Sequence, residues 1–108
     1  MSIGKNIVRQ NMPGSLTVLH TVPVAKKTEI RSITACNNDE DNSAIWFLYL
    51  RPSGGSLVSL VPGTVQWVVP AGENIDYETW KVLGAGDTIE GYSPGNIDLH
   101  IDGAEVDA

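Results

Sequence analysis

Eight consecutive residues, from Ala44 to Arg51, constrain this sequence most, because no other stretch is apolar for so long. In a β-strand, alternate side chains point to opposite faces of the sheet. One set comprises Ala44, Trp46, Leu48 and Leu50, and the other comprises Ile45, Phe47, Tyr49 and Arg51. Because both sets are largely hydrophobic, we expect both faces of this strand to be covered, either by the fold or by another molecule.

The ends of the two sets indicate which one faces the core. The first set ends in Leu48 and Leu50, whereas the second ends in the amphipathic Tyr49 and the charged Arg51. We therefore predict that the first set points inward. The outward set then supplies a candidate interface of Ile45, Phe47 and Tyr49, and we add Trp67 from a second doubly apolar stretch, residues 65–69. Together these side chains would form a patch too large for a monomer to leave in water.

Turn-forming residues divide the remaining sequence into short segments, as is typical of a β-protein. Apolar or β-branched runs lie between Gly, Pro and polar turn residues at a spacing of about ten residues. We predict strands over residues 15–22, 27–37, 44–51, 56–61, 64–69, 74–83, 87–92 and 97–106. This pattern predicts an all-β fold, a single antiparallel, jelly-roll-like β-sandwich of about eight short strands without a significant helix. Residues 15–108 form the sandwich, and residues 1–14 are expected to form an extended N-terminal arm.

Length, charge and cysteine content limit the classes of function. A chain of 108 residues suits one domain. The formal net charge of −6 argues against nucleic-acid binding. Residues 1–60 carry six basic and four acidic side chains, whereas residues 61–108 carry one basic and nine acidic ones. This asymmetry either orients the molecule against a partner or forms a solvated acidic surface.

The cysteine content and the absence of targeting segments in the sequence indicate the expected cellular location. Cys36 is the only cysteine, so no internal disulfide forms, which fits a reducing cytoplasm. The thiol is expected to be a small buried group rather than a nucleophile. We find neither a signal peptide nor an apolar run long enough to span a membrane, and expect a soluble protein.

One segment matches the sequence pattern of a catalytic motif but lacks a backbone group that the motif needs. Residues 91–95 fit the G-x-S-x-G pattern of serine hydrolases. The oxyanion hole of that motif uses the backbone N–H after the serine, but Pro94 follows Ser93 and has none. We therefore interpret the segment as a β-turn and expect no catalytic residue in the chain.

Candidate metal and phosphate sites also have simpler explanations. Asp98, His100 and Asp102 alternate with the apolar residues of the last strand and are expected to form a wet outer face. The acidic residues 39–41 lack the Gly and Glu of a calcium-binding loop, and residues 84–86 lack the third Gly and the helix of a phosphate loop. We predict turns at both places, no metal and no cofactor.

The order of the short motifs resembles a family of small β-sandwich virion proteins common among tailed bacteriophages. The resemblance covers about residues 17–107. It is carried by residues 21–33, Ala35-Cys36-Asn37, Leu48-Tyr49-Leu50-Arg51-Pro52 with Gly54-Gly55, residues 69–73, residues 82–89 and residues 99–106. The chain departs from the family at Val24-Ala25, where Ala-Gly is commoner, and in the bulkier Ile45-Trp46-Phe47.

This resemblance implies a structural role in the virion, with assembly in the host cytoplasm, and no enzymatic activity. We expect an oligomeric protein, such as a trimer, that decorates or cements the capsid. Its expected partners are other copies of itself and the major capsid protein or another virion protein. Lys5 and Arg9 in the arm would contact an acidic shell. The alternatives are a tail, neck, baseplate or fibre component, and, in another class, a carbohydrate-binding module that uses its tryptophans.

Overall fold

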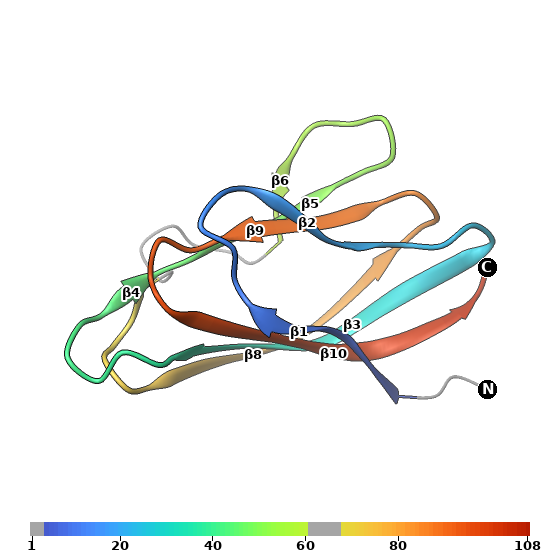
Figure 1. Cartoon of the computed structure of the whole chain (residues 1–108). Helices are drawn as coiled ribbons and strands as arrows, with labels where there is room; N and C mark the ends of the chain where they lie inside the picture. Colours follow the sequence, from blue (N-terminus) through green and yellow to red (C-terminus); the bar gives the residue numbers. More distant parts are fainter. Residues whose placement is uncertain (1–3, 61–67) are drawn as a thin grey trace.

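The computed structural model is a sandwich of two antiparallel four-stranded sheets (Figure 1) and describes residues 4–60 and 68–108. Sheet A has the order β1 (Gly4–Asn11), β10 (Ile97–Asp107), β3 (Lys26–Asn37) and β8 (Asn74–Leu83). Sheet B has the order β2 (Thr17–Thr21), β9 (Thr88–Tyr92), β5 (Phe47–Arg51) and β6 (Val58–Ser59). The described residues include no helix, which confirms the predicted all-β antiparallel sandwich.

Strand pairing is nested along the chain. β1 pairs with β10, β2 with β9 and β3 with β8. The short β4 (Ala44–Ile45) pairs with β7 (Val68–Val69), and β5 pairs with β6. The first half of the chain thus runs antiparallel to the second half, as in a long hairpin wound into two layers. The jelly-roll-like arrangement expected from the sequence stays a prediction.

The predicted strand over residues 44–51 is broken at Trp46 into two, and residues 4–11 add another, so the described residues form ten strands rather than about eight. Ala44 and Ile45 pair with β7, whereas Phe47 is the first residue to pair with β9. β9 ends at Tyr92, and the hydroxyl of Ser93 donates a 2.7 Å hydrogen bond to the carbonyl of Ile45. The β5–β9 ladder therefore stops at the Phe47–Tyr92 pair, and the chain changes partner.

Residues 4–11 form a full strand of sheet A, where the sequence predicted an extended arm outside the sandwich. β1 pairs with β10 from Gly4 to Asn11, with a bulge between Asn6 and Val8. Ile7, Val8 and Met12 are buried in the core. Apolar burial and ladder hydrogen bonds hold this segment, which is consequently not a separate unit. Residues 1–3 lie outside the described residues.

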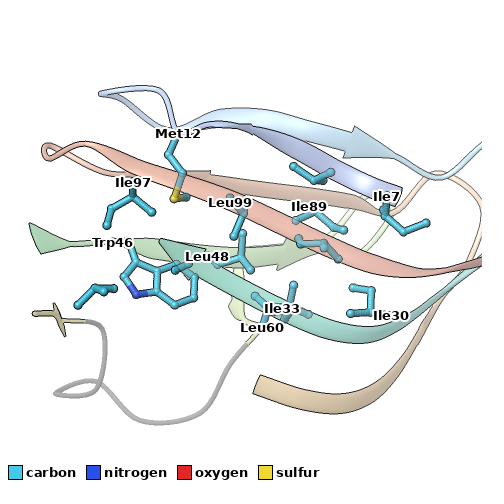
Figure 2. Close-up of a cluster of buried hydrophobic side chains, with 14 of the residues drawn as sticks. Ile7, Met12, Ile30, Ile33, Trp46, Leu48, Leu60, Ile89, Ile97 and Leu99 are labelled. Atoms are coloured by element: carbon cyan, nitrogen blue, oxygen red, sulfur yellow. The ribbon is translucent and has the colours of Figure 1, made fainter. Parts of the chain in front are cut away.

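The core lies between the sheets and confirms the predicted inward set. Trp46 and Leu48 are fully buried, Ala44 is buried, and Leu50 packs against the cluster. Figure 2 shows Trp46 and Leu48 pointing into the space between the layers, as do Ile33 of β3 and Leu99 of β10.

Other predictions about individual strands have mixed outcomes. Ile97, Leu99 and Ile101 are fully buried, while Asp98, His100 and Asp102 alternate with them on the outer face, as expected. Of the predicted strand over 64–69, the structure describes only Val68 and Val69, and Trp67 lies outside the described residues.

Candidate protein-binding face

Three aromatic side chains lie on the outer face of sheet B. Phe47 and Tyr49 alternate with the buried Leu48 on β5, so both point away from the core. Tyr92 of β9 is directly opposite Phe47, and the two rings stack with centroids 4.7 Å apart and an interplanar angle of 20°. The three side chains are only partly buried, which leaves ring surface on the outside of the sandwich.

Exposed aliphatic side chains extend this surface on two sides. Ile45 of β4 is paired with Val68 of β7, and the two side chains are 40% and 44% exposed. On β2, Val18 is paired with Glu90 and is 50% exposed. We call the set of Ile45, Phe47, Tyr49, Val68, Tyr92 and Val18 the aromatic face. Grouped apolar side chains at this exposure are typical of surfaces that bind another protein.

An ion pair lies beside the aromatic rings. Glu90 is opposite Tyr49 in the ladder and is buried on this face. Its carboxylate accepts hydrogen bonds from Arg51 Nε and Thr88 Oγ1, each at 2.8 Å. The hydrogen bond from Arg51 holds the pKa of Glu90 below its ordinary value. Because the charge is already compensated within the chain, covering this face would leave no unpaired carboxylate.

The structure thus brings together three of the predicted interface residues, Ile45, Phe47 and Tyr49, and adds three that were not predicted, namely Val68, Tyr92 and Val18. Tyr92 lies on β9, which pairs with β5, and Val18 lies on β2, which pairs with the other side of β9, so both reach this face only in the folded sheet. The alternation of Thr88, Glu90 and Tyr92 was visible in the sequence, but nothing there set its register against Phe47. That these residues form an interface stays a prediction.

The predicted shell contacts, Lys5 and Arg9, lie on β1 in sheet A and not on the aromatic face. Lys5 Nζ forms a 2.8 Å ion pair with Glu105, and Arg9 donates a 2.7 Å hydrogen bond to Asn6 Oδ1. Their contact with a shell stays a prediction.

The motifs set aside at the sequence level have structural roles. The hydroxyl of Ser93 donates to Ile45 and accepts a 3.0 Å hydrogen bond from the backbone N–H of Gly95, so it holds the predicted turn. Asp39 accepts from the backbone N–H groups of Asp41 and Asn42, which lowers its pKa and closes the acidic turn. Cys36 is partly buried, and burial raises the pKa of its thiol, which disfavours the reactive thiolate.

Residues 4–60 and 68–108 contain neither a pocket nor a group of three His, Cys, Asp or Glu side chains placed to hold a metal ion. No helix in that part of the chain could span a membrane.

Comparison with known proteins finds solved structures of low sequence identity. No protein-family model and no curated protein matches the chain. One similar structure is a pentameric capsid protein isolated from metagenomic phage sequences, with 19% identity and a TM-score of 0.43 over 94% of this chain. A second structure described in the same words, solved by iodide phasing, has 19% identity and a TM-score of 0.37 over 94% of this chain. The chain spans 60% and 62% of their lengths, and similarity at this level defines neither its function nor its assembly.

Proposed function

We propose that this protein is a non-enzymatic structural component of a bacteriophage virion, which it joins by binding another virion protein through the aromatic face. The observation that carries the proposal is the stacked pair Phe47 and Tyr92, on an outer face that continues to Tyr49, Ile45 and Val68. The order of motifs over residues 17–107 supports it, since it resembles small virion proteins of tailed phages. The nested strand winding is also one used by viral capsid domains, an analogy of fold.

Burial of apolar surface would supply the binding free energy. Removing such surface from water contributes about 25 cal/mol per Å² before the losses of association are subtracted. Stacked rings make good anchors because they order a large area at a small entropic cost. The pair of Arg51 and Glu90 next to Tyr49 adds polarity without an unmet charge.

Within this class, we propose capsid decoration as the specific role, with the protein acting as a homo-oligomer, of which a trimer is one form. A tail, neck, baseplate or fibre location is the alternative. Immunogold labelling of intact particles separates the two, because decoration predicts gold over the head and the alternative predicts gold at the tail.

Binding to emptied capsids tests the proposal directly. Wild-type protein should sediment with capsids of the phage that encodes it, and Phe47→Asp should remain in the supernatant. Asp102→Ala on the outer face of sheet A is the control and should sediment as wild type does. Protein that neither self-associates nor binds any part of the particle contradicts the proposal.

One observation favours a carbohydrate-binding module as a second candidate. Trp80 on β8 is 61% exposed, and the guanidinium of Arg31 lies 5.2 Å from its ring centroid. Exposed tryptophans of β-sandwiches stack on sugar rings. Titration with host polysaccharide should then change the tryptophan emission of the wild type but not of Trp80→Ala. No change with any glycan removes this candidate.

A further inference from the structure

Sheet A ends in two long strands whose outer edges are open. No described strand pairs with the far side of β1, which has 8 residues, or of β8, which has 10 residues. In sheet B, by contrast, the edge strand β6 has only 2 residues. An open strand presents unpaired N–H and C=O groups and is a template for another strand, so long open edges need either protection or a partner.

The two open edges carry opposite charge. β1 contains Lys5 and Arg9 and no acidic residue. The first half of β8 contains Asp76 and Glu78 and no basic residue, since Lys81 lies in its second half. Two β1 edges, or two acidic β8 halves, would repel each other, whereas β1 and the acidic half of β8 attract. The charges therefore oppose the pairing of two β1 edges and favour the pairing of β1 with the acidic half of β8.

The side chains that would meet lie on the same face of the sheet. Arg9 is paired with His100 and Asp76 with Thr34, both on the outer face of sheet A. Glu78, two residues from Asp76, is exposed on that face as well. Among the described residues, the Arg9 guanidinium forms no ion pair and the Glu78 carboxylate accepts no hydrogen bond. Both are thus available to a second molecule.

Strand directions also fit. The three antiparallel pairings across sheet A make β1 run opposite to β8. If a neighbouring copy has the same orientation, its β1 lies antiparallel to β8 of the first copy. Antiparallel pairing is slightly more stable per residue than parallel pairing. Such a ladder brings Arg9 of the neighbour to the half of β8 that contains Asp76 and Glu78, because the strands run in opposite senses. It would also shield Trp80 and Val82, which are 61% and 52% exposed on β8.

We propose that copies of this chain join edge to edge, β1 of one copy pairing with β8 of the next, so that sheet A continues through the assembly. The contact is head-to-tail, so it closes into a ring or continues as an open array. It leaves the aromatic face of sheet B free for a different protein, and Arg9 contacts the next copy rather than a shell. The inference rests on the proposed function only in that the protein works as an assembly of copies.

Charge exchange across this contact is the test, measured by sedimentation velocity over a range of protein concentrations. Arg9→Glu and Glu78→Arg should each weaken self-association by about tenfold or more, since each places like charges opposite one another. The double variant Arg9→Glu/Glu78→Arg should restore it. Lys27→Glu, on the inner strand β3, makes the same change of net charge as Arg9→Glu and should associate like the wild type. Thermal unfolding should show that every variant is folded.

The outcomes separate this inference from the proposed function. Wild-type protein that stays monomeric, single variants that associate normally, or a double variant that fails to recover would each overturn edge pairing. If edge pairing fails while Phe47→Asp still abolishes capsid binding, the proposed function stands. If the charge exchange behaves as expected but no part of the particle binds the protein, the proposed function fails.

Discussion

At the scale of single residues, the alternation from Ala44 to Arg51 separates stability from binding. Leu48 is fully buried between the sheets, while its neighbours Phe47 and Tyr49 are partly exposed on the other side. Substitution at adjacent positions should therefore have unlike effects, and this contrast is a property of the strand rather than of the residue types.

A charge at each position exposes the difference. Leu48→Asp should unfold the domain, because burying an unpaired charge costs several kcal/mol and small domains have about 5–15 kcal/mol in total. Phe47→Asp should stay folded and lose binding to the particle. Circular dichroism and urea unfolding measure the first effect, and capsid sedimentation measures the second. Equal unfolding by both variants would show that the outer face is structural.

We expect His20 to make the stability of the fold depend on pH. Its Nε2 lies 3.1 Å from Oγ1 of the buried Thr28, with Glu105 and Lys5 nearby. Burial lowers the pKa of His20 below 6.5, in spite of the opposing effect of Glu105. As pH falls below 6.5, the unfolded chain binds a proton that the folded chain does not, so the free energy of unfolding falls until the folded pKa is reached.

His20→Gln should reduce this loss of stability on acidification, because glutamine does not titrate. Urea unfolding at a series of pH values from neutral down to the folded pKa measures the slope. His100→Gln, on the outer face of sheet A, replaces the other histidine and is the matched control. An unchanged slope in His20→Gln would assign the pH dependence to other groups.

At the scale of elements, one buried amide ties the end of β3 to the short strand β7. Asn37 Nδ2 donates to the carbonyls of Asn42, Val69 and Pro70 at 2.9, 3.1 and 3.3 Å, and Oδ1 accepts from the N–H of Asp39. Since β7 pairs with β4, this amide also sets the position of Ile45 at the margin of the aromatic face.

Asn37→Ala should reduce the free energy of unfolding by about 2–3 kcal/mol, because it removes the hydrogen bonds of one buried and three part-buried backbone groups. Asn38→Ala is the control and should have little effect, since Asn38 is exposed and its side-chain contacts, such as the 3.3 Å hydrogen bond to Asn96 Oδ1, lie on the surface. Urea unfolding measures both. A loss below about 0.5 kcal/mol in Asn37→Ala would mean that other contacts hold β7.

The sequence predicts strands well here, because Gly, Pro and short polar runs separate them and because residues 97–102 alternate cleanly. It does not predict the break at Trp46, which depends on where β9 ends, far away in the chain. Nor does it reveal β1, where a bulge buries both Ile7 and Val8 and so removes the alternation that marks a strand. The Phe47–Tyr92 stack depends on a register between distant strands, which local patterns do not carry.

At the scale of the whole molecule, the two sheets present different outer surfaces. Sheet A carries exposed or partly exposed acidic side chains, namely Asp76, Glu78, Asp98 and Asp102. Sheet B carries the aromatic face. The charge asymmetry between the halves of the sequence does not become one between the faces, because sheet A combines the basic strands β1 and β3 with the acidic strands β8 and β10. A particle protein with two such faces would have one side for attachment and one side toward solvent.

Cryo-electron microscopy of the phage particle is the most direct test of the central claim. The account predicts density for this sandwich on the virion, with Phe47, Tyr49 and Tyr92 packed against a neighbouring protein. A particle that lacks the protein, or one that carries it with these three side chains open to solvent, would contradict the account.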